Sequence, residues 1–342
     1  MLTHKTRVLL FTCALLPFRA SAALITYANT VAGQSQLGAA GPPLSCTTGG
    51  PTAQVRNNLP VGSIPSAGFP IDTGCGVGQN LNELTSAFGP ITSGSALNST
   101  FAIDGVTTVT YNGSSQGRAD YFDVGVLAAA SYTGPSNNMT YIGSEAFGIS
   151  RDTLTIPGAT GQAGMFRATM TLDGSMSAAG PGGAYLIFFY QKDNGPQFDG
   201  VRLTVDPRGF TNAVVRNPVP GGAAFTVLPA SISGSTEFFF DVPIVFGTPF
   251  DLSVGLFASV IPSATGAWGS TFLTSATLTG ISIFDSSGGA LSDFSVLSGS
   301  GTAYGPGGLV TQPNPIPEPA SFVLLATGLV GAGLVRKKIN RG

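Results

Sequence analysis

The stretch Tyr185-Leu186-Ile187-Phe188-Phe189-Tyr190 decides the fold class, because its residues are apolar at every position. Successive side chains of a strand point to opposite faces, so this run predicts a strand that is covered on both sides. Phe238-Phe239-Phe240 repeats the pattern further along the chain. Around these runs apolar residues mostly alternate with polar ones, and Gly, Pro, Asn and Asp separate the segments. We therefore predict an all-β fold, a β-sandwich or jelly-roll-like domain over residues 100–310.

The strands expected in this domain are 100–111, 121–132, 145–156, 165–172, 184–191, 201–205, 223–228, 236–246, 250–261 and 270–284. Residues 24–99 are richer in Gly, Pro, Ser and Thr, and we expect a loop-rich segment that packs on the sandwich. Within it we predict a first strand at 24–29 and a short helix near 80–88. No repeat of fixed period is present, which argues against a solenoid.

The composition is that of a folded but weakly charged chain. Charged residues make up 9% of the 342 residues, against about 25% in an average soluble protein. Hydrophobic residues make up 43%, which is enough for a packed core and argues against general disorder.

Residues 1–23 have the pattern of a secretory signal peptide. Lys5 and Arg7 precede an 11-residue, mostly apolar run at 8–18, and small residues follow up to Ala22. A helix over that run would rise only about 16 Å, which is too short to span about 30 Å of hydrocarbon. We expect cleavage at the end of this segment.

A second apolar run, residues 320–335, lies near the other end of the chain and contains no charged residue. A cluster of cations follows it directly: Arg336, Lys337, Lys338 and Arg341. We predict a C-terminal transmembrane helix over 320–335, with these cations as a stop-transfer signal on the cytoplasmic side. The alternative is a buried core helix, which the basic tail disfavours. The proline-rich residues 311–316 form a stiff spacer in front of it.

The segment 23–317 carries eight Lys and Arg against sixteen Asp and Glu, a net charge of −8. Such a surface repels phosphate backbones, so no nucleic acid partner is expected. The single histidine, His4, lies in the signal peptide, so catalysis based on histidine and histidine-ligated zinc are excluded for the exported chain. We expect no enzymatic activity and no cofactor.

Two cysteines, Cys46 and Cys75, follow the signal peptide. Because exported proteins meet an oxidising environment, we predict a disulfide between them. It would close a loop of about 30 residues and stabilise the fold by about 3–4 kcal/mol on a chain-entropy estimate. The alternative is two free, buried thiols.

The C-terminal 26 residues resemble a known bacterial sorting signal. Pro317-Glu318-Pro319, the apolar run and the basic tail, residues 317–342, together resemble the PEP-CTERM sorting signal. This segment is also known as the ice-binding protein C-terminal domain, a label that does not imply ice binding. The resemblance implies a Gram-negative bacterium, recognition by an exosortase, and an inner-membrane-anchored precursor. The mature form is then expected at the cell surface or outside the cell, in an organism that makes extracellular polysaccharide.

Four shorter motifs resemble the ectodomains that often precede this signal. They are residues 151–156 (RDTLTI), 169–174 (TMTLDG), 242–247 (VPIVFG) and 298–304 (SGSGTAY). The resemblance supports a sandwich ectodomain and implies no catalytic residue.

Three kinds of candidate site remain. For glycan stacking the candidates are Trp268, the only tryptophan, and Tyr111, Tyr121, Tyr132 and Tyr141. Weak candidates for calcium ligands are Asp193, Asp199, Asp285 and Asp293, with Asp120 and Asp123 as a further pair. For each aspartate the simpler interpretation is an ordinary turn, and for Trp268 it is a core or edge residue.

Carboxylates are the last catalytic class in quantity. The glutamates of the body are Glu83, Glu145 and Glu237, and a pair of carboxylates about 5–10 Å apart could hydrolyse a glycosidic bond. The simpler interpretation is solvated acids on strand faces.

These observations predict an exported, envelope-tethered surface or matrix protein that acts as a scaffold or adhesin in an exopolysaccharide or biofilm layer. Its expected partners are an exosortase and the bacterial membrane, with extracellular polysaccharide as a further candidate. The alternative is a carbohydrate-binding β-sandwich module, and a carboxylate-dependent glycoside hydrolase is the third possibility.

Overall fold

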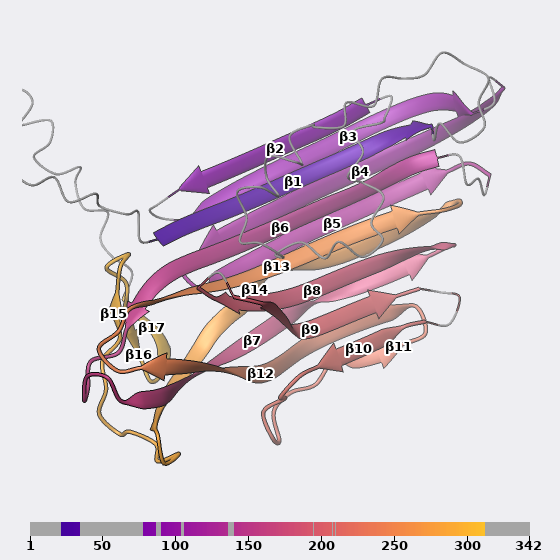
Figure 1. Ribbon diagram of the computed structural model, residues 1–342. Helices are drawn as coiled ribbons and strands as arrows, with labels where there is room; N and C mark the ends of the chain where they lie inside the picture. Colours follow the sequence, from indigo (N-terminus) through magenta and orange to yellow (C-terminus); the bar gives the residue numbers. More distant parts are fainter. Residues whose placement is uncertain are drawn as a thin grey trace, which may run out of the picture.

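The computed structural model describes residues 22–34, 78–86, 90–103, 106–135, 140–193, 195–206, 208 and 210–311. Two antiparallel sheets lie face to face and form the body (Figure 1). The all-β prediction is confirmed, and no helix occurs among the described residues. None of these residues forms a helix with the length and apolarity that a membrane crossing requires. The predicted transmembrane helix, 320–335, lies outside the described residues.

Sheet A has seven strands in a continuous path. Their order is β10 (Asn212–Val215), β9 (Gln197–Val205), β8 (Gly182–Lys192), β13 (Phe250–Pro262), β6 (Thr140–Thr155), β1 (Ala22–Gln34) and β2 (Gly78–Ser86). The short strand β15 (Leu297–Ser298) adds to the end of β6. Strand β6 is therefore central, with β1 and β13 hydrogen-bonded on its two sides.

Sheet B also has seven strands. Their order is β11 (Thr226–Leu228), β12 (Ser231–Val245), β7 (Ala163–Ala179), β14 (Gly266–Asp285), β5 (Asp123–Thr133), β4 (Thr107–Asp120) and β3 (Ile91–Ile103). A separate hairpin, β16 (Ala303–Gly305) and β17 (Gly308–Thr311), lies at one end of the sandwich (Figure 1). The edge strands β10 and β11 lie on the same side of the molecule, as Figure 1 shows.

Strand β8 contains the opening stretch and is buried on both faces, as its sequence predicts. Leu186 and Phe188 are fully buried and belong to the core between the sheets. Ile187 and Phe189 point to the opposite face and are also buried. The aromatic triplet of β12 differs: Phe238 and Phe240 enter the core, whereas Phe239 is half-buried beneath the Arg167 guanidinium, 4.0 Å from its ring centroid.

The described parts of segment 24–99 consist almost wholly of strands. The first strand is present and longer than 24–29, as β1. The helix predicted near 80–88 is wrong, because β2 occupies Gly78–Ser86 and pairs along the free edge of β1. The boundary at 99/100 falls inside β3, which belongs to sheet B. Pairing with a neighbouring strand outweighs the weak helical propensity of 80–88, since it satisfies the backbone groups of an exposed edge.

Two other boundaries shift for a local reason. The predicted strand 100–111 runs across the turn between β3 and β4. The predicted strand 121–132 begins in the turn between β4 and β5 and otherwise follows β5. The expected strand 223–228 is reduced to β11. Apolar turn residues, such as Tyr121 and Phe122, continue the alternation through a turn and so conceal it.

Candidate functional site

The chain just before the sorting segment is bound to the centre of sheet A. Asp152, on β6, is fully buried, and its carboxylate accepts hydrogen bonds from the hydroxyls of Ser298 (2.5 Å), Ser300 (2.6 Å) and Tyr304 (3.1 Å). The backbone N–H of Ser300 donates a fourth bond at 3.1 Å. We call these four residues the C-terminal latch. It joins the sequence motifs 151–156 and 298–304.

The latch stays polar inside an apolar environment. Burial raises the pKa of Asp152 above its ordinary range, and the four donors act in the opposite direction. Burial also raises the pKa of the Tyr304 hydroxyl above its ordinary value, so this hydroxyl stays neutral and donates to Asp152. Four donors satisfy the lone pairs of the Asp152 carboxylate. Asp152 therefore binds residues 298–304 through hydrogen bonds alone, without an ion pair.

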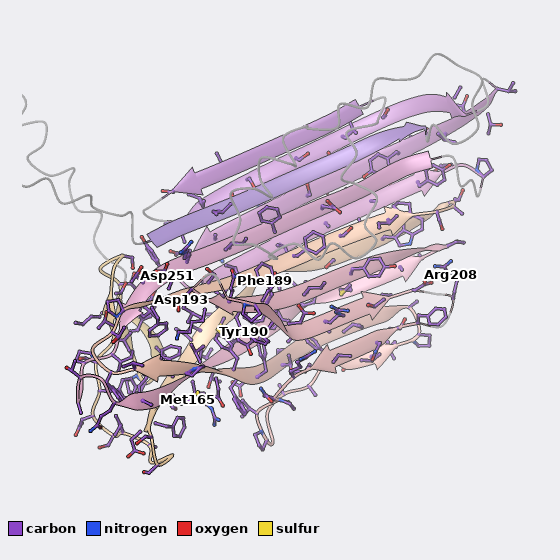
Figure 2. The ribbon with its side chains drawn as sticks, in the orientation of Figure 1. Met165, Phe189, Tyr190, Asp193, Arg208 and Asp251 are labelled. Carbon is purple, nitrogen blue, oxygen red and sulfur yellow. The ribbon has the colours of Figure 1, made fainter. Side chains whose placement is uncertain are left out.

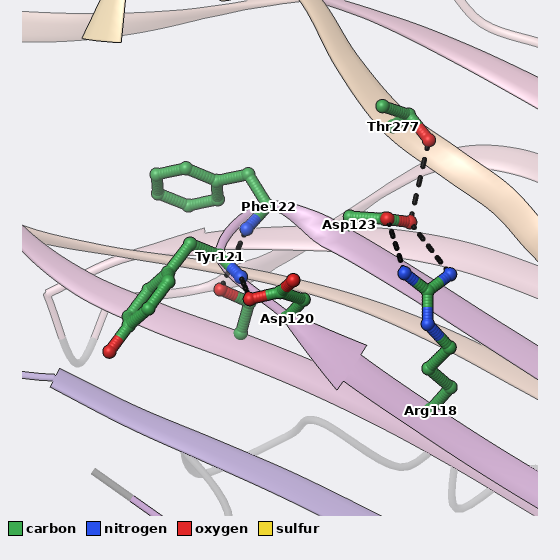
Figure 3. A network of polar contacts seen from close by, with 7 residues as sticks. Arg118, Asp120, Tyr121, Phe122, Asp123 and Thr277 are labelled. Atoms are coloured by element: carbon green, nitrogen blue, oxygen red, sulfur yellow. Dashed lines mark hydrogen bonds and ion pairs between the residues drawn. The ribbon is translucent and has the colours of Figure 1, made fainter. Parts of the chain in front are cut away.

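The β4–β5 turn, which Figure 3 shows from close by, contacts the latch through Phe122. The Phe122 ring lies 5.3 Å from the Tyr304 ring, and the N–H of Phe122 donates to the Ser150 hydroxyl at 2.9 Å. Asp120 accepts the N–H of Tyr121 at 2.8 Å. Phe122 has φ of 50°, a conformation rarely adopted by a non-glycine residue. These contacts anchor the strained turn, which covers the latch with an aromatic ring.

The turn is also tied to its neighbours in sheet B. Arg118 pairs with Asp123 at 2.7 Å, and the Thr277 hydroxyl donates to the same carboxylate at 3.4 Å (Figure 3). The Asp120 carboxylate therefore binds a backbone donor, and the Asp123 carboxylate binds arginine and threonine donors. Both aspartates stabilise the turn, which is the simpler interpretation given for them.

A groove lies at the β9–β10 edge of sheet A. Its volume is about 220 Å³, and it is lined by Asp199, Gly200, Val201, Arg202, Val214 and Arg216. Arg202 pairs with Asp199 at 2.5 Å. Sequence reasoning did not identify this groove, although Arg202, Arg208 and Arg216 lie close together in a sequence that has few cations.

The prediction of exposed glycan-stacking rings is wrong for the four candidates whose side chains are described. Trp268 is 3% exposed and belongs to the core between the sheets. Three close glycines make room for its ring, since a Cβ on Gly182 or Gly266 would lie within 2.9 Å of it. Tyr111, Tyr121 and Tyr132 are also buried, so none of these rings is available to a sugar. The side chain of Tyr141 is not described.

The calcium candidates do not gather into one site. Asp193 accepts the N–H of Asp251 at 2.9 Å, and the two residues lie side by side in Figure 2. Asp251 is itself paired with Arg151. Asp285 caps its own turn, accepting the N–H groups of Ser287 and Gly289.

Asp199 pairs with Arg202, and Asp293 is exposed. Among the residues that the structure describes, no three His, Cys, Asp or Glu side chains are placed to hold a metal ion. The turn interpretation fits Asp285 directly, because its hydrogen bonds are those of an Asx turn.

The glutamates do not form a catalytic pair. Glu145 is on β6 beside Ser144, whose hydroxyl points between the sheets to bond Tyr111, so Glu145 lies on the outer face of sheet A. It is buried there, so the interpretation as a solvated acid is wrong for this residue. Glu237 lies between two buried residues of β12 and faces outward from sheet B. The two carboxyls are thus on opposite sides of the sandwich. The side chain of Glu83 is not described.

Several predicted residues lie outside the described residues. They are Cys46, Cys75, Pro317, Glu318, Pro319, Arg336, Lys337, Lys338 and Arg341. The signal peptide up to residue 21 lies outside them as well. The disulfide therefore stays a prediction.

A comparison with protein families matches residues 315–338 to the PEP-CTERM protein-sorting motif. The chain carries a PEP-CTERM motif. The match includes the Pro317-Glu318-Pro319 triplet, the apolar run and three of the four cations, and it confirms the resemblance. A PEP-CTERM motif is a sorting signal recognised by exosortase, a membrane protein, and implies an exported, membrane-anchored precursor in Gram-negative bacteria. No curated protein and no solved structure matches the chain significantly.

Proposed function

We propose that this chain is a non-enzymatic scaffold or adhesin of an extracellular polymer layer, delivered to the envelope by its PEP-CTERM motif and processed by an exosortase. One observation carries the proposal: the motif begins at residue 315, four residues after β17 ends at Thr311, and the latch holds residues 298–304, where the β16–β17 hairpin begins. A short spacer therefore joins the sorting segment to a hairpin that the latch connects to strand β6.

This connection suits a protein that is held by its C-terminus. A pull on the C-terminal end is transmitted through 298–304 to Asp152 on β6. Strand β6 is hydrogen-bonded to β1 and β13 along most of its length, so the force is spread over two ladders. Resistance to such a pull is what a matrix scaffold or a surface adhesin requires.

The non-enzymatic part of the proposal rests on the chemistry of the described side chains. The exported chain lacks histidine, and the two described glutamates lie on opposite faces. Asp123 and Asp241 pair with arginines, and the buried Asp152 binds hydroxyl and backbone donors within the sandwich. These interactions stabilise a fold and do not assemble a nucleophile with a base.

The proposal is tested by mass spectrometry of the mature C-terminus in the source bacterium with and without its exosortase. We expect a shortened C-terminus near Glu318 and recovery in the extracellular matrix when the enzyme is present. Without it, we expect the intact C-terminus in the inner membrane. Recovery of the same intact C-terminus in both strains, or of the chain in the cytoplasm, would overturn the proposal.

A carbohydrate-binding module is the second candidate. The observation that favours it is the β9–β10 groove, which the exposed Val214 lines together with Arg202 and Arg216. Trp268 and the described tyrosines, on which the sequence prediction depended, are buried.

A further inference from the structure

A contiguous apolar patch lies on the outer face of sheet A. Its residues alternate along β6, β13 and β8 with residues of the core, so they point away from sheet B. The strand register sets Phe257 beside both Phe147 and Ile187. In the next row Gly255 lies between Ile149 and Phe189, and a Cβ on Gly255 would lie 2.2 Å from the Phe189 ring. We call five apolar side chains the outer patch: Phe147, Ile149, Ile187, Phe189 and Phe257.

The outer patch is buried, although it lies outside the core between the sheets. Each of its side chains is at most 4% exposed, and none belongs to the cluster that fills the space between the sheets. Every strand in the described part of the chain belongs to sheet A, to sheet B or to the β16–β17 hairpin at one end of the sandwich (Figure 1). A face of five large apolar residues requires a further part of the protein to exclude water from it.

We propose that residues 35–77, the segment between β1 and β2, pack on the outer face of sheet A and cover the outer patch. This packing does not depend on the proposed function. It specifies the face of the sandwich on which the N-terminal segment lies and the residue that anchors it there.

The strand topology brings both ends of the segment to sheet A. Strand β1 ends at residue 34 and β2 begins at residue 78, and these strands are hydrogen-bonded neighbours with Ala32 opposite Gly78. The segment has 43 residues, so each half of it can extend to about 70 Å. Phe147 lies seven residues along β6 from Thr140, the partner of Gln34, a distance of about 24 Å. Strand β8 is three strand spacings from β1, or about 14 Å, so the whole patch is within reach.

The composition of the segment suits an apolar face. Its only charged residues are Arg56 and Asp72. Both cysteines that follow the signal peptide, Cys46 and Cys75, belong to it, so the predicted disulfide would join two parts of the segment. Its nine large apolar residues are Leu37, Leu44, Val55, Leu59, Val61, Ile64, Phe69, Ile71 and Val77.

A buried carboxylate on the same face supplies a second argument. Glu145 lies two positions before Phe147 on β6 and is 8% exposed. The Ser259 hydroxyl donates to the Glu145 carboxylate at 3.5 Å. Because burying a carboxylate is costly unless a cation or further donors are present, the segment that covers this face is expected to bring a positive charge.

Arg56 is the cation that we expect beside Glu145. Segment 23–317 contains eight basic residues, and six of them pair with aspartates in the described structure. A seventh, Arg216, lines the groove next to β10, which is four strands away from β6. Arg56 is the eighth and the only basic residue of 35–77. The segment thus offers one cation to the one carboxylate beside the outer patch.

The first test places a photo-crosslinker in the outer patch of the full-length chain, purified in detergent. Phe189→p-benzoylphenylalanine and Phe147→p-benzoylphenylalanine each put a reactive ketone there, and mass spectrometry identifies the peptide that it captures. We expect cross-links within one molecule to peptides from 35–77. Phe239→p-benzoylphenylalanine is the matched control, because Phe239 lies on the outer face of sheet B, and it should capture none of these peptides. Cross-links from the patch to residues 312–342, cross-links to a second copy at twice the mass, or a complete lack of peptides from 35–77 would each overturn the inference.

The second test is a double-mutant cycle on the ion pair. Arg56→Gln should lower the melting temperature, and the decrease should be much smaller in a Glu145→Gln background, where the pair is already lost. Arg208→Gln is the matched control, because Arg208 pairs with Asp206 and its effect should add to that of Glu145→Gln. Additive effects of Arg56→Gln and Glu145→Gln would overturn the pairing of these two residues.

Discussion

The hydroxyl of Tyr304 donates a hydrogen bond to the buried carboxylate of Asp152 at 3.1 Å, although 152 positions separate the two residues in the chain. Strand β6 thereby holds the segment that leads into the PEP-CTERM motif. This contact joins β16 to the centre of sheet A.

The first prediction concerns pH. Because burial raises the folded-state pKa of Asp152, the folded protein binds a proton there more tightly than the unfolded chain does. The contribution of Asp152 to stability is therefore greatest at low pH and is lost as the pH rises from about 3.9 through the raised value. The Asp152→Asn variant lacks this loss, so its stability should rise relative to the wild type between pH 4 and 7. Urea unfolding across that range measures the difference.

The control for this prediction has the opposite sign. Hydrogen bonds from Arg208 lower the pKa of Asp206, so the contribution of Asp206 is present at neutral pH and is lost on acidification. Asp206→Asn should accordingly lose stability relative to the wild type as the pH rises. If Asp152→Asn followed the same trend as Asp206→Asn, the assignment of Asp152 as a desolvated carboxylate would be wrong.

The second prediction concerns the latch itself. Tyr304→Phe removes one donor from a buried carboxylate and keeps the ring that packs on Phe122. We expect it to destabilise the fold by about 1–3 kcal/mol, the cost of weakening a buried charged hydrogen bond. Amide hydrogen exchange should accelerate first in residues 298–304. Unchanged exchange there, with a fold as stable as the wild type, would show that the latch does not hold the segment.

The third prediction concerns Trp268, which fills the core between the sheets. Trp268→Ala should destabilise the fold by about 3–5 kcal/mol, because it leaves a cavity in a close-packed region. Urea unfolding measures the difference, and a Trp268→Ala protein as stable as the wild type would contradict the placement of this ring in the core.

The fourth prediction concerns the close approach of the two sheets at Gly148 on β6. A Cβ at this position would lie 2.0 Å from the Arg118 carbonyl oxygen, a backbone atom of sheet B that cannot move aside cheaply. Gly148→Ala should cost about 2–4 kcal/mol through overpacking. Gly94→Ala is the matched control, because the nearest atom to its Cβ would be 3.9 Å away. Similar melting temperatures for the two variants would contradict this packing.

The sequence predicted the fold class through local periodicity, and it failed where local signals are weak. Strand β8 is apolar at successive positions and is buried on both faces, so its environment follows from its own residues. Residues 78–86 carry no such signal, and they form a strand because the free edge of β1 is adjacent to them. Trp268 stands among small residues in the sequence, which suggests exposure, but three glycines around the ring make a space for it in the core.

By itself the sequence determined the all-β class and the PEP-CTERM motif, because both are encoded by neighbouring residues. Only the tertiary structure decided that Asp152 meets Ser300 across 148 positions, that the glutamates of β6 and β12 face apart, and that Arg202 and Arg216 border one groove. Such contacts depend on strand order and register, and these emerge when two whole sheets pack, which no short stretch of chain encodes.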